Sequence, residues 1–427
     1  MLIYKFVKNL AALSMLVLYR KLYFIDAHKL PSKHDGATIF AVNHPTAFTD
    51  SFIFMVYSPF DCYFILRGDF FKVSKFVRWF MDQIRLVPIF RKRDGFSALK
   101  ENQALFDSFY TLLHEGKDIS IMVEGSHDHR KRLRKVQRGT SRIILGTYDK
   151  YGTTNIKIVP IGLTYSDVTK FRSTAAVRFG DAIYLKDYLE LYAENQRKAS
   201  VEMTKEIEAR MKPLLVHVEQ EEDDKLADHL LDMNRHNQKR DLFPSFSKSP
   251  DRLEAEIAIA NKVNALEKTE KERLKEKVTT YFEQLKKLNI SDVGIAKVKQ
   301  IGFGTTLFLM LFSPLFLAGY LLGFVPLQVA KFVTNKMKKP EFIGSMMLVG
   351  GMFGYLIYFV IMLIVAAVFG TWWAWTTVLL MPFVSYFAIL HRDVFLEWWA
   401  VGKFNRTEKK ARNQLMAKRK EILDVFA

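Results

Sequence analysis

Residues 37–50 read ATIFAVNHPTAFTD, and this stretch decides the fold that we expect for the chain. Its first six residues are mostly apolar and include β-branched side chains, so they predict a buried β-strand. The polar cluster that follows, residues 43–50, predicts a turn from the strand into a helix. Ligands of α/β sheets bind at the carboxyl ends of strands, so this turn is the first place to look for a functional site.

Short apolar runs and amphipathic stretches continue to alternate after this turn, as far as residue 185. Five further runs predict strands, at residues 62–66, 84–90, 118–123, 156–165 and 175–183. Apolar residues at three- and four-residue spacing predict helices at 70–81, 96–115 and 138–150. Such alternation is typical of an α/β domain, here a mixed β-sheet covered by helices.

The charge of the chain indicates an anionic partner. It has 427 residues and a formal net charge of +18, which suits nucleic acid, a phospholipid surface or a phosphorylated cofactor. No recognisable nucleic-acid-binding motif accompanies the charge, so we expect an anionic membrane and no nucleic acid. Cys62 is the only cysteine, which excludes an intrachain disulfide and a multi-cysteine zinc site.

Changes in composition divide the chain. Residues 6–19 are apolar, contain Lys8 and are too short to span a membrane comfortably, so we predict an interfacial helix, with a buried helix as the alternative. After the α/β domain comes a long, charged helical region in which glycine is almost absent. The predicted parts are an N-terminal helix and lead-in (1–36), the α/β domain (37–190), the charged helical region (191–300), transmembrane segments (301–391) and a basic tail (392–427).

Three apolar segments, 303–326, 342–369 and 371–390, are each long enough to cross a hydrocarbon core. Tryptophans near the segment ends favour a membrane location, because their rings prefer the headgroup level. None of the segments contains Asp, Glu, Lys or Arg, which transporter pathways usually contain. We therefore predict a membrane anchor, with a non-enzymatic scaffold or transporter as the alternative.

Basic residues flank all three apolar segments. Under the positive-inside rule every flank faces the cytoplasm, which three full spans cannot satisfy. Pro314, Gly319 and Gly323 interrupt the first segment, so we expect it to turn back, while the other two form a hairpin turning at Gly370. The predicted location is the cell (inner) membrane, with the α/β domain on the cytoplasmic side.

His44 and Asp50 lie six residues apart in the turn after the first strand. A histidine can take a proton from a hydroxyl, and a carboxylate at its other ring nitrogen fixes the tautomer and stabilises the imidazolium. Such a pair also arises by chance, with Asn43 or Asp50 serving as a helix cap. The pair alone leaves both interpretations open.

Four blocks in a fixed order carry more information than this pair. They are Asn43-His44 with Asp50, VPIFR at 87–91, IMVEGS at 121–126 and IVPIG at 158–162. In these blocks, residues 37–185 resemble the glycerophospholipid acyltransferase family, of the lysophosphatidic acid or glycerol phosphate type and the bacterial branch. The chain differs from the family in having five residues between His44 and Asp50 instead of four, and Val123 in place of proline. Thr49 would restore the usual spacing, but a hydroxyl cannot stabilise an imidazolium as a carboxylate does.

The resemblance implies an acyltransferase-type fold and a role for each matching residue. His44 would be the general base and Asp50 its partner. Arg91, near Arg67, would bind the acceptor phosphate, for which a guanidinium has suitably paired donors. Glu124 would orient the acceptor hydroxyl or a binding arginine. The expected catalytic residues are thus His44 and Asp50, and the expected substrate-binding residues are Arg67, Arg91, Glu124, Gly125, Ser126 and Pro160.

The stretch after Gly125 allows other interpretations. Ser126, His127 and Asp128 are consecutive, so they cannot face one another as a hydrolase triad must. His127, Asp128 and His129 have no further cluster in the sequence to complete a metal site, so we expect no metal. The basic run 129–138 would contact the donor's phosphates or anionic lipid, and a solubilising loop is an equal alternative.

The predicted function is that of a membrane-bound O-acyltransferase in phospholipid biosynthesis. It would move a fatty acyl group from acyl-CoA or acyl-carrier protein to a hydroxyl of glycerol phosphate or lysophosphatidic acid. The donor is a co-substrate, and no cofactor is expected. Another lysolipid as acceptor is the alternative within this class, because pocket shape decides both the acceptor and the chain length.

Overall fold

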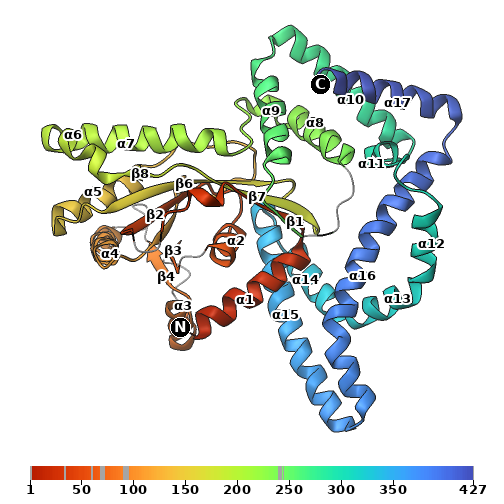
Figure 1. Ribbon diagram of the computed structural model, residues 1–427, viewed down its shortest axis with the longest axis horizontal. Coiled ribbons are helices and arrows are strands. Elements are labelled where there is room, and N and C mark those ends of the chain that lie inside the picture. Colours follow the sequence, from red (N-terminus) through yellow and green to blue (C-terminus); the bar gives the residue numbers. More distant parts are fainter. Residues whose placement is uncertain are drawn as a thin grey trace. The chain divides into compact units, whose positions relative to one another are not determined.

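The computed structural model describes residues 2–32, 35–58, 61–67, 73–89, 96–238, 243 and 245–426. These residues form two compact units (Figure 1). Unit 1 comprises residues 1–215, 246–250 and 337–345, and unit 2 comprises residues 216–245, 251–336 and 346–427. Unit 1 therefore includes residues on both sides of the predicted 37–190 domain, together with a short segment from far along the chain.

Unit 1 contains a mixed sheet, which for the described residues has nine strands in the order β4-β3-β5-β2-β6-β7-β1-β9, with β8 beside β6. Strands β4, β3, β5, β2 and β6 run parallel to one another, whereas β7 and β8 pair antiparallel with β6. The strands are β1 (Tyr19–Ile25), β2 (Ala37–Val42), β3 (Tyr63–Arg67), β4 (Leu86–Ile89), β5 (Ile119–Met122), β6 (Ile156–Tyr165), β7 (Ser173–Phe179), β8 (Ile183–Tyr184) and β9 (Phe246–Ser247).

Every strand predicted from the sequence is present, and the predicted fold class is confirmed. β2 and β6 have the predicted bounds, because both are buried along their whole length and are therefore mostly apolar. β1 was not predicted. Its sequence, YRKLYFI, directly follows the apolar helix α1 (Leu2–Leu18), so the two periodicities merge in the sequence. Pairing with β7 and β9 decides that these residues are extended.

Helices cover both faces of the sheet (Figure 1). On one face, Ile39 of β2 lies in a core with Phe109, Ile144 and Met203, which belong to α4, α5 and α7. On the other face, Phe40 packs against Phe54 of α2 with ring centroids 4.8 Å apart, and α1 packs on α2. The further helices of unit 1 are α2 (Thr49–Tyr57), α3 (Lys75–Gln83), α4 (Phe96–His114), α5 (Gly139–Tyr151), α6 (Leu189–Glu194) and α7 (Gln196–Met211).

Unit 2 is helical. α8 packs against α9, α10 and α11, and a buried ion pair joins Arg419 of α17 to Asp292 of α11, with 2.7 Å between Arg419 Nε and Asp292 Oδ1. The helices are α8 (Asp224–Asn237), α9 (Asp251–Ala265), α10 (Lys268–Lys287), α11 (Asp292–Ala296), α12 (Phe303–Leu311), α13 (Ser313–Leu322), α14 (Phe324–Asn335), α15 (Pro340–Phe369, which begins in unit 1), α16 (Trp372–Asn405) and α17 (Lys409–Asp424).

Two helices, α15 and α16, are long and apolar enough to cross a membrane. They are joined at Gly370, whose φ of +63° favours glycine, and Ala366 of α15 packs with Val378 of α16. The first predicted segment is broken: α12 and α13 meet at a bend of 53°, and Pro314 lies in the first turn of α13, where its missing N–H is tolerated.

Candidate active site

The carboxyl end of β2 is held against β6 by the side chain of Asn43. Asn43 Nδ2 donates to the carbonyl of Leu163 at 3.0 Å, and Asn43 Oδ1 accepts from the amide of Leu163 at 2.7 Å. Asn43 is 5% exposed, so both bonds are shielded from water. This paired contact continues the β2–β6 ladder by one residue and fixes the point at which the chain leaves the sheet.

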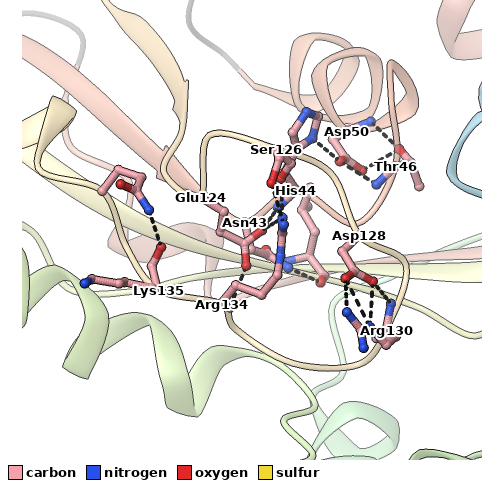
Figure 2. Close-up of polar contacts among 12 residues, drawn as sticks. Asn43, His44, Thr46, Asp50, Glu124, Ser126, Asp128, Arg130, Arg134 and Lys135 are labelled. Carbon is pink, nitrogen blue, oxygen red and sulfur yellow. Dashed lines mark hydrogen bonds and ion pairs between the residues drawn. The ribbon is translucent and has the colours of Figure 1, made fainter. Parts of the chain in front are cut away.

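His44 and Asp50 face each other across the turn, with 2.9 Å between His44 Nδ1 and Asp50 Oδ2 (Figure 2). A carboxylate only accepts hydrogen bonds, so Nδ1 carries the proton and Nε2 carries the lone pair. The Asp50 side chain is fully buried, whereas the His44 side chain is 15% exposed. This geometry leaves the imidazole able to take a proton at Nε2 while a buried anion faces its other nitrogen.

The carboxylate of Asp50 is also bound by Thr46 and Tyr165. Thr46 donates its amide to Oδ2 at 2.9 Å and its hydroxyl to Oδ1 at 2.7 Å. Tyr165, from β6, donates its hydroxyl to Oδ1 at 2.8 Å. Burial, and then the charge of Asp50, raise the pKa of Tyr165 well above its usual value, so the phenol stays protonated and donates. Asp50 is thus held in one orientation from both sides.

Glu124, at the end of β5, accepts hydrogen bonds from His44 and Arg134. Its Oε2 accepts the His44 amide at 2.8 Å and Arg134 Nη2 at 2.9 Å, and its Oε1 accepts the Arg134 amide at 2.7 Å (Figure 2). Arg134 Nη1 also donates to Ser126 Oγ at 2.7 Å. In the sequence, nothing separates Arg134 from the other cations of the basic run 129–138. Only its contacts distinguish it.

Gly125 lies between Glu124 and Ser126, the two residues whose side chains bind Arg134, and has a φ of +70°. A side chain here would meet only Gln137 Cγ, at an ordinary 3.6 Å, so it is the backbone conformation that favours glycine. The turn at Gly125 allows Ser126 Oγ to accept its hydrogen bond from Arg134. Two of the predicted site residues, Glu124 and Ser126, therefore bind the same arginine, and Gly125 forms the turn between them.

The loop after Ser126 meets the first turn of α15. His129 Nδ1 lies 3.1 Å from Glu341 Oε1, and the donor atoms of Asp128, His129 and Glu341 lie within 4.8 Å of one another. Glu341 is the third ligand that the sequence could not connect to this cluster. Both oxygens of Asp128 already accept hydrogen bonds from Arg130, and these bonds, against the opposing effect of burial, lower the pKa of Asp128 to about 2. We therefore interpret the cluster as ion pairs.

The remaining predicted substrate-binding residues are Arg67, Arg91 and Pro160. Arg91 lies outside the described residues, and so do the cations that follow it at 92 and 93. Arg67 is the last residue of β3, which pairs with β4 through Arg67 and Ile89. Pro160 is buried in β6, opposite Ala41, and its carbonyl accepts the Gly180 amide at 2.8 Å. Contacts of these residues with substrate stay predictions.

Known proteins are similar to the part of this chain that contains the candidate site. The family model Acyltransferase matches residues 22–164, which run from within β1 to near the end of β6 and include the turn with His44 and Asp50. Glycerol-3-phosphate O-acyltransferase 1 of Saccharomyces cerevisiae is 34% identical over 88 residues, which are 21% of this chain and 12% of the relative. Glycerol-3-phosphate O-acyltransferase 2 of the same yeast is 30% identical over 108 residues, 25% of this chain and 14% of the relative.

The chain thus matches only about an eighth of the length of these yeast relatives. Among solved structures, the 1-acyl-sn-glycerophosphate (LPA) acyltransferase PlsC from Thermotoga maritima aligns with a TM-score of 0.36 and 12% identity. That alignment covers 48% of this chain and 78% of the other.

Proposed function

We propose that this chain, which belongs to the acyltransferase family through residues 22–164, transfers a fatty acyl group from a thioester to a hydroxyl of glycerol phosphate or lysophosphatidic acid. The family match agrees with the resemblance seen in the four sequence blocks. The proposed donor is acyl-CoA or acyl-carrier protein. One observation carries the proposal: His44 and Asp50 lie 2.9 Å apart at the carboxyl end of a central strand, inside the matched region.

In the proposed reaction, His44 Nε2 takes the proton of the acceptor hydroxyl as its oxygen attacks the thioester carbonyl carbon. The tetrahedral intermediate collapses with cleavage of the C–S bond, and the leaving thiolate takes the proton back from the imidazolium. The products are an ester and a thiol. Asp50 keeps the imidazole in the required tautomer and stabilises its positive charge, and no acyl-enzyme intermediate is needed.

Recognition of the acceptor is proposed to involve Arg91 and Arg67, whose guanidinium groups suit phosphate oxygens. Glu124 was expected to orient either the acceptor hydroxyl or a binding arginine. Its two bonds to Arg134 support the second role. Ser126 Oγ already accepts from Arg134, so its hydroxyl proton is available to a ligand.

An acceptor panel tests the proposal. Purified protein in detergent would be incubated with one labelled acyl thioester and with glycerol phosphate, lysophosphatidic acid, other lysophospholipids or lyso-amino-acid lipids. We expect one labelled ester, formed from glycerol phosphate or lysophosphatidic acid. A product from an acceptor without a phosphomonoester would contradict the proposed substrate class. No ester with any acceptor would contradict acyl transfer itself.

A membrane surface is the proposed location of the reaction. Helix α1 packs one face in unit 1, while Leu2, Phe6 and Leu13 on its other face are 85%, 57% and 64% exposed. On α3, Phe76 and Trp79 are 70% and 47% exposed. Large exposed side chains of this kind suit insertion among lipid headgroups, which supports the interfacial role proposed for α1.

We further propose that α15 and α16 cross the cell membrane as a hairpin, that α12 and α13 form a re-entrant pair, and that unit 1 is cytoplasmic. The 53° bend between α12 and α13 supports this arrangement. α15 has 30 residues and is about 45 Å long, which exceeds a hydrocarbon core of about 30 Å. Its first turns can therefore stand outside the bilayer.

Labelling of single cysteines should report this topology. In a Cys62→Ala background, we expect an impermeant thiol reagent on intact cells to label Trp372→Cys, and not Lys338→Cys or Lys410→Cys. Trp372 is 79% exposed and avoids the strained backbone of Gly370. Detergent-treated cells, in which all three should react, are the control. Labelling at 338 or 410 in intact cells would mean that the first segment crosses fully.

A further inference from the structure

The first turn of α15, residues 340–345, is part of unit 1 and contacts the turn that carries His44 and Asp50. About 300 residues of chain separate the two segments. Three consecutive amides of the catalytic turn donate to this first turn. Ala47 N donates to the Glu341 carbonyl at 3.1 Å, and Phe48 N and Thr49 N donate to Ser345 Oγ at 2.9 and 3.1 Å.

These amides belong to the N-terminal end of α2, where backbone N–H groups have no partner within the helix. Phe48 is the residue before α2, and it provides no side-chain cap. A helix usually meets this need with a Ser, Thr, Asp or Asn of its own. Here Thr46 Oγ1 accepts the Asp50 amide at 3.2 Å, and the hydroxyl that accepts the Phe48 and Thr49 amides belongs to Ser345, which is fully buried.

The hydroxyl of Ser345 is saturated by its contacts in the catalytic turn. Its two lone pairs accept the Phe48 and Thr49 amides, so its proton must point to Thr49 Oγ1, 2.9 Å away. Asp50 is the next residue, and its carboxylate is the partner of His44. A shift at the start of α2 would therefore move Asp50 relative to the imidazole.

Close backbone packing places Ser345 at this position. A Cβ on Gly344 would lie 2.5 Å from the carbonyl oxygen of Val168, so only glycine permits this approach without a shift. Beside it, the ring of Phe342 contacts those of His127 and Phe48, with centroids 4.9 and 6.1 Å apart. The first turn of α15 is thus fitted to the catalytic turn by shape as well as by hydrogen bonds.

We propose that the first turn of α15 is the positioning element of the active site, and that Ser345 is a positioning residue that holds Asp50 in register with His44. A helix that continues as a candidate membrane span thereby orders the catalytic base. This inference rests on the proposed role of His44. It adds to the site two residues, Gly344 and Ser345, that lie far outside the segment matched by the family model.

Two variants test the proposal, each with a matched control in the full-length protein. Ser345→Ala removes the cap, and Ser385→Ala removes another buried serine hydroxyl, which has no hydrogen-bond partner in the described part of the chain. Gly344→Ala disturbs the packing against Val168, and Gly351→Ala changes the same helix where a Cβ meets nothing within 4 Å. In Ser345→Ala and Gly344→Ala we expect kcat to fall about 10- to 100-fold, because the catalytic base is misplaced. The KM values for the acyl donor and the acceptor should not change, because substrate binding is not affected. Both controls should match the parent protein.

Hydrogen exchange separates this inference from the proposed function. In Ser345→Ala, the amides of Phe48 and Thr49 should exchange at least tenfold faster, whereas the amides of the β2–β6 ladder should not change. This readout does not depend on acyl transfer, so it stands even if His44→Ala retains activity and the proposed mechanism fails. Unchanged exchange at 48 and 49 would overturn the inference, as would parental kcat in Ser345→Ala when His44→Ala is inactive.

Discussion

Replacing His44 with alanine should lower kcat for acyl transfer by about 10²–10⁴-fold, because the loss of a general base has a cost of this size. The fold should survive, since the His44 backbone contacts to Glu124 and Asp128 do not involve the imidazole. Kinetics of the purified variant with a labelled thioester would measure the loss. Membrane extraction yield and thermal midpoint should equal those of the parent protein.

The neighbouring residues provide the sharper comparison. Asp50→Asn should be nearly as damaging as His44→Ala, because an amide at this position no longer stabilises an imidazolium. Thr49→Ala should be milder, since the Thr49 hydroxyl contacts Ser345 and not the imidazole. A Thr49 variant more damaged than the Asp50 variant would show that the longer turn uses a different orienting residue. Near-parental turnover in His44→Ala would falsify the mechanism.

Replacing Arg419 with methionine should destabilise unit 2 by about 3–5 kcal/mol, because it leaves Asp292 buried without its guanidinium partner. Asp292 accepts hydrogen bonds from Arg419, Tyr281 and His236, and its side chain is 1% exposed. Hydrogen exchange of α8 and α11 in detergent would detect the loss as faster opening. Lys277→Met is the control, because its partner Glu421 is exposed, and it should leave exchange unchanged.

The buried pair of Asp292 and Arg419 should make the stability of unit 2 depend on pH. Burial alone would raise the pKa of Asp292, but the hydrogen bonds from His236 and Arg419 outweigh burial and hold it at about 2, below the ordinary 3.8. Because the pKa of Asp292 is lower in the folded state, its ionised carboxylate stabilises the fold above pH 3.8. This contribution is lost as the pH falls from 3.8 through 2. The loss should amount to about 2 kcal/mol. Equal exchange protection of α11 at pH 5 and pH 2.5 would contradict it.

The local periodicity of apolar residues was sufficient to predict most strands of the sheet. β2 and β6 are buried along their whole length, and their apolar runs therefore coincide with the strands. β1 was missed because Arg20 and Lys21 interrupt a short apolar run that already follows an apolar helix. Its partners, β7 and β9, begin about 150 and 220 residues later, and no local pattern carries that pairing.

The sequence by itself determined that His44 and Asp50 share one turn after a buried strand, and that long apolar segments lie in the last third of the chain. Both follow from neighbouring residues, because side-chain periodicity and turn chemistry act over a few positions. Only the tertiary structure decided that Glu124 binds Arg134 and that Ser345 caps α2. A buried donor or acceptor must find a partner, but its identity depends on which distant segments the fold brings within about 3 Å.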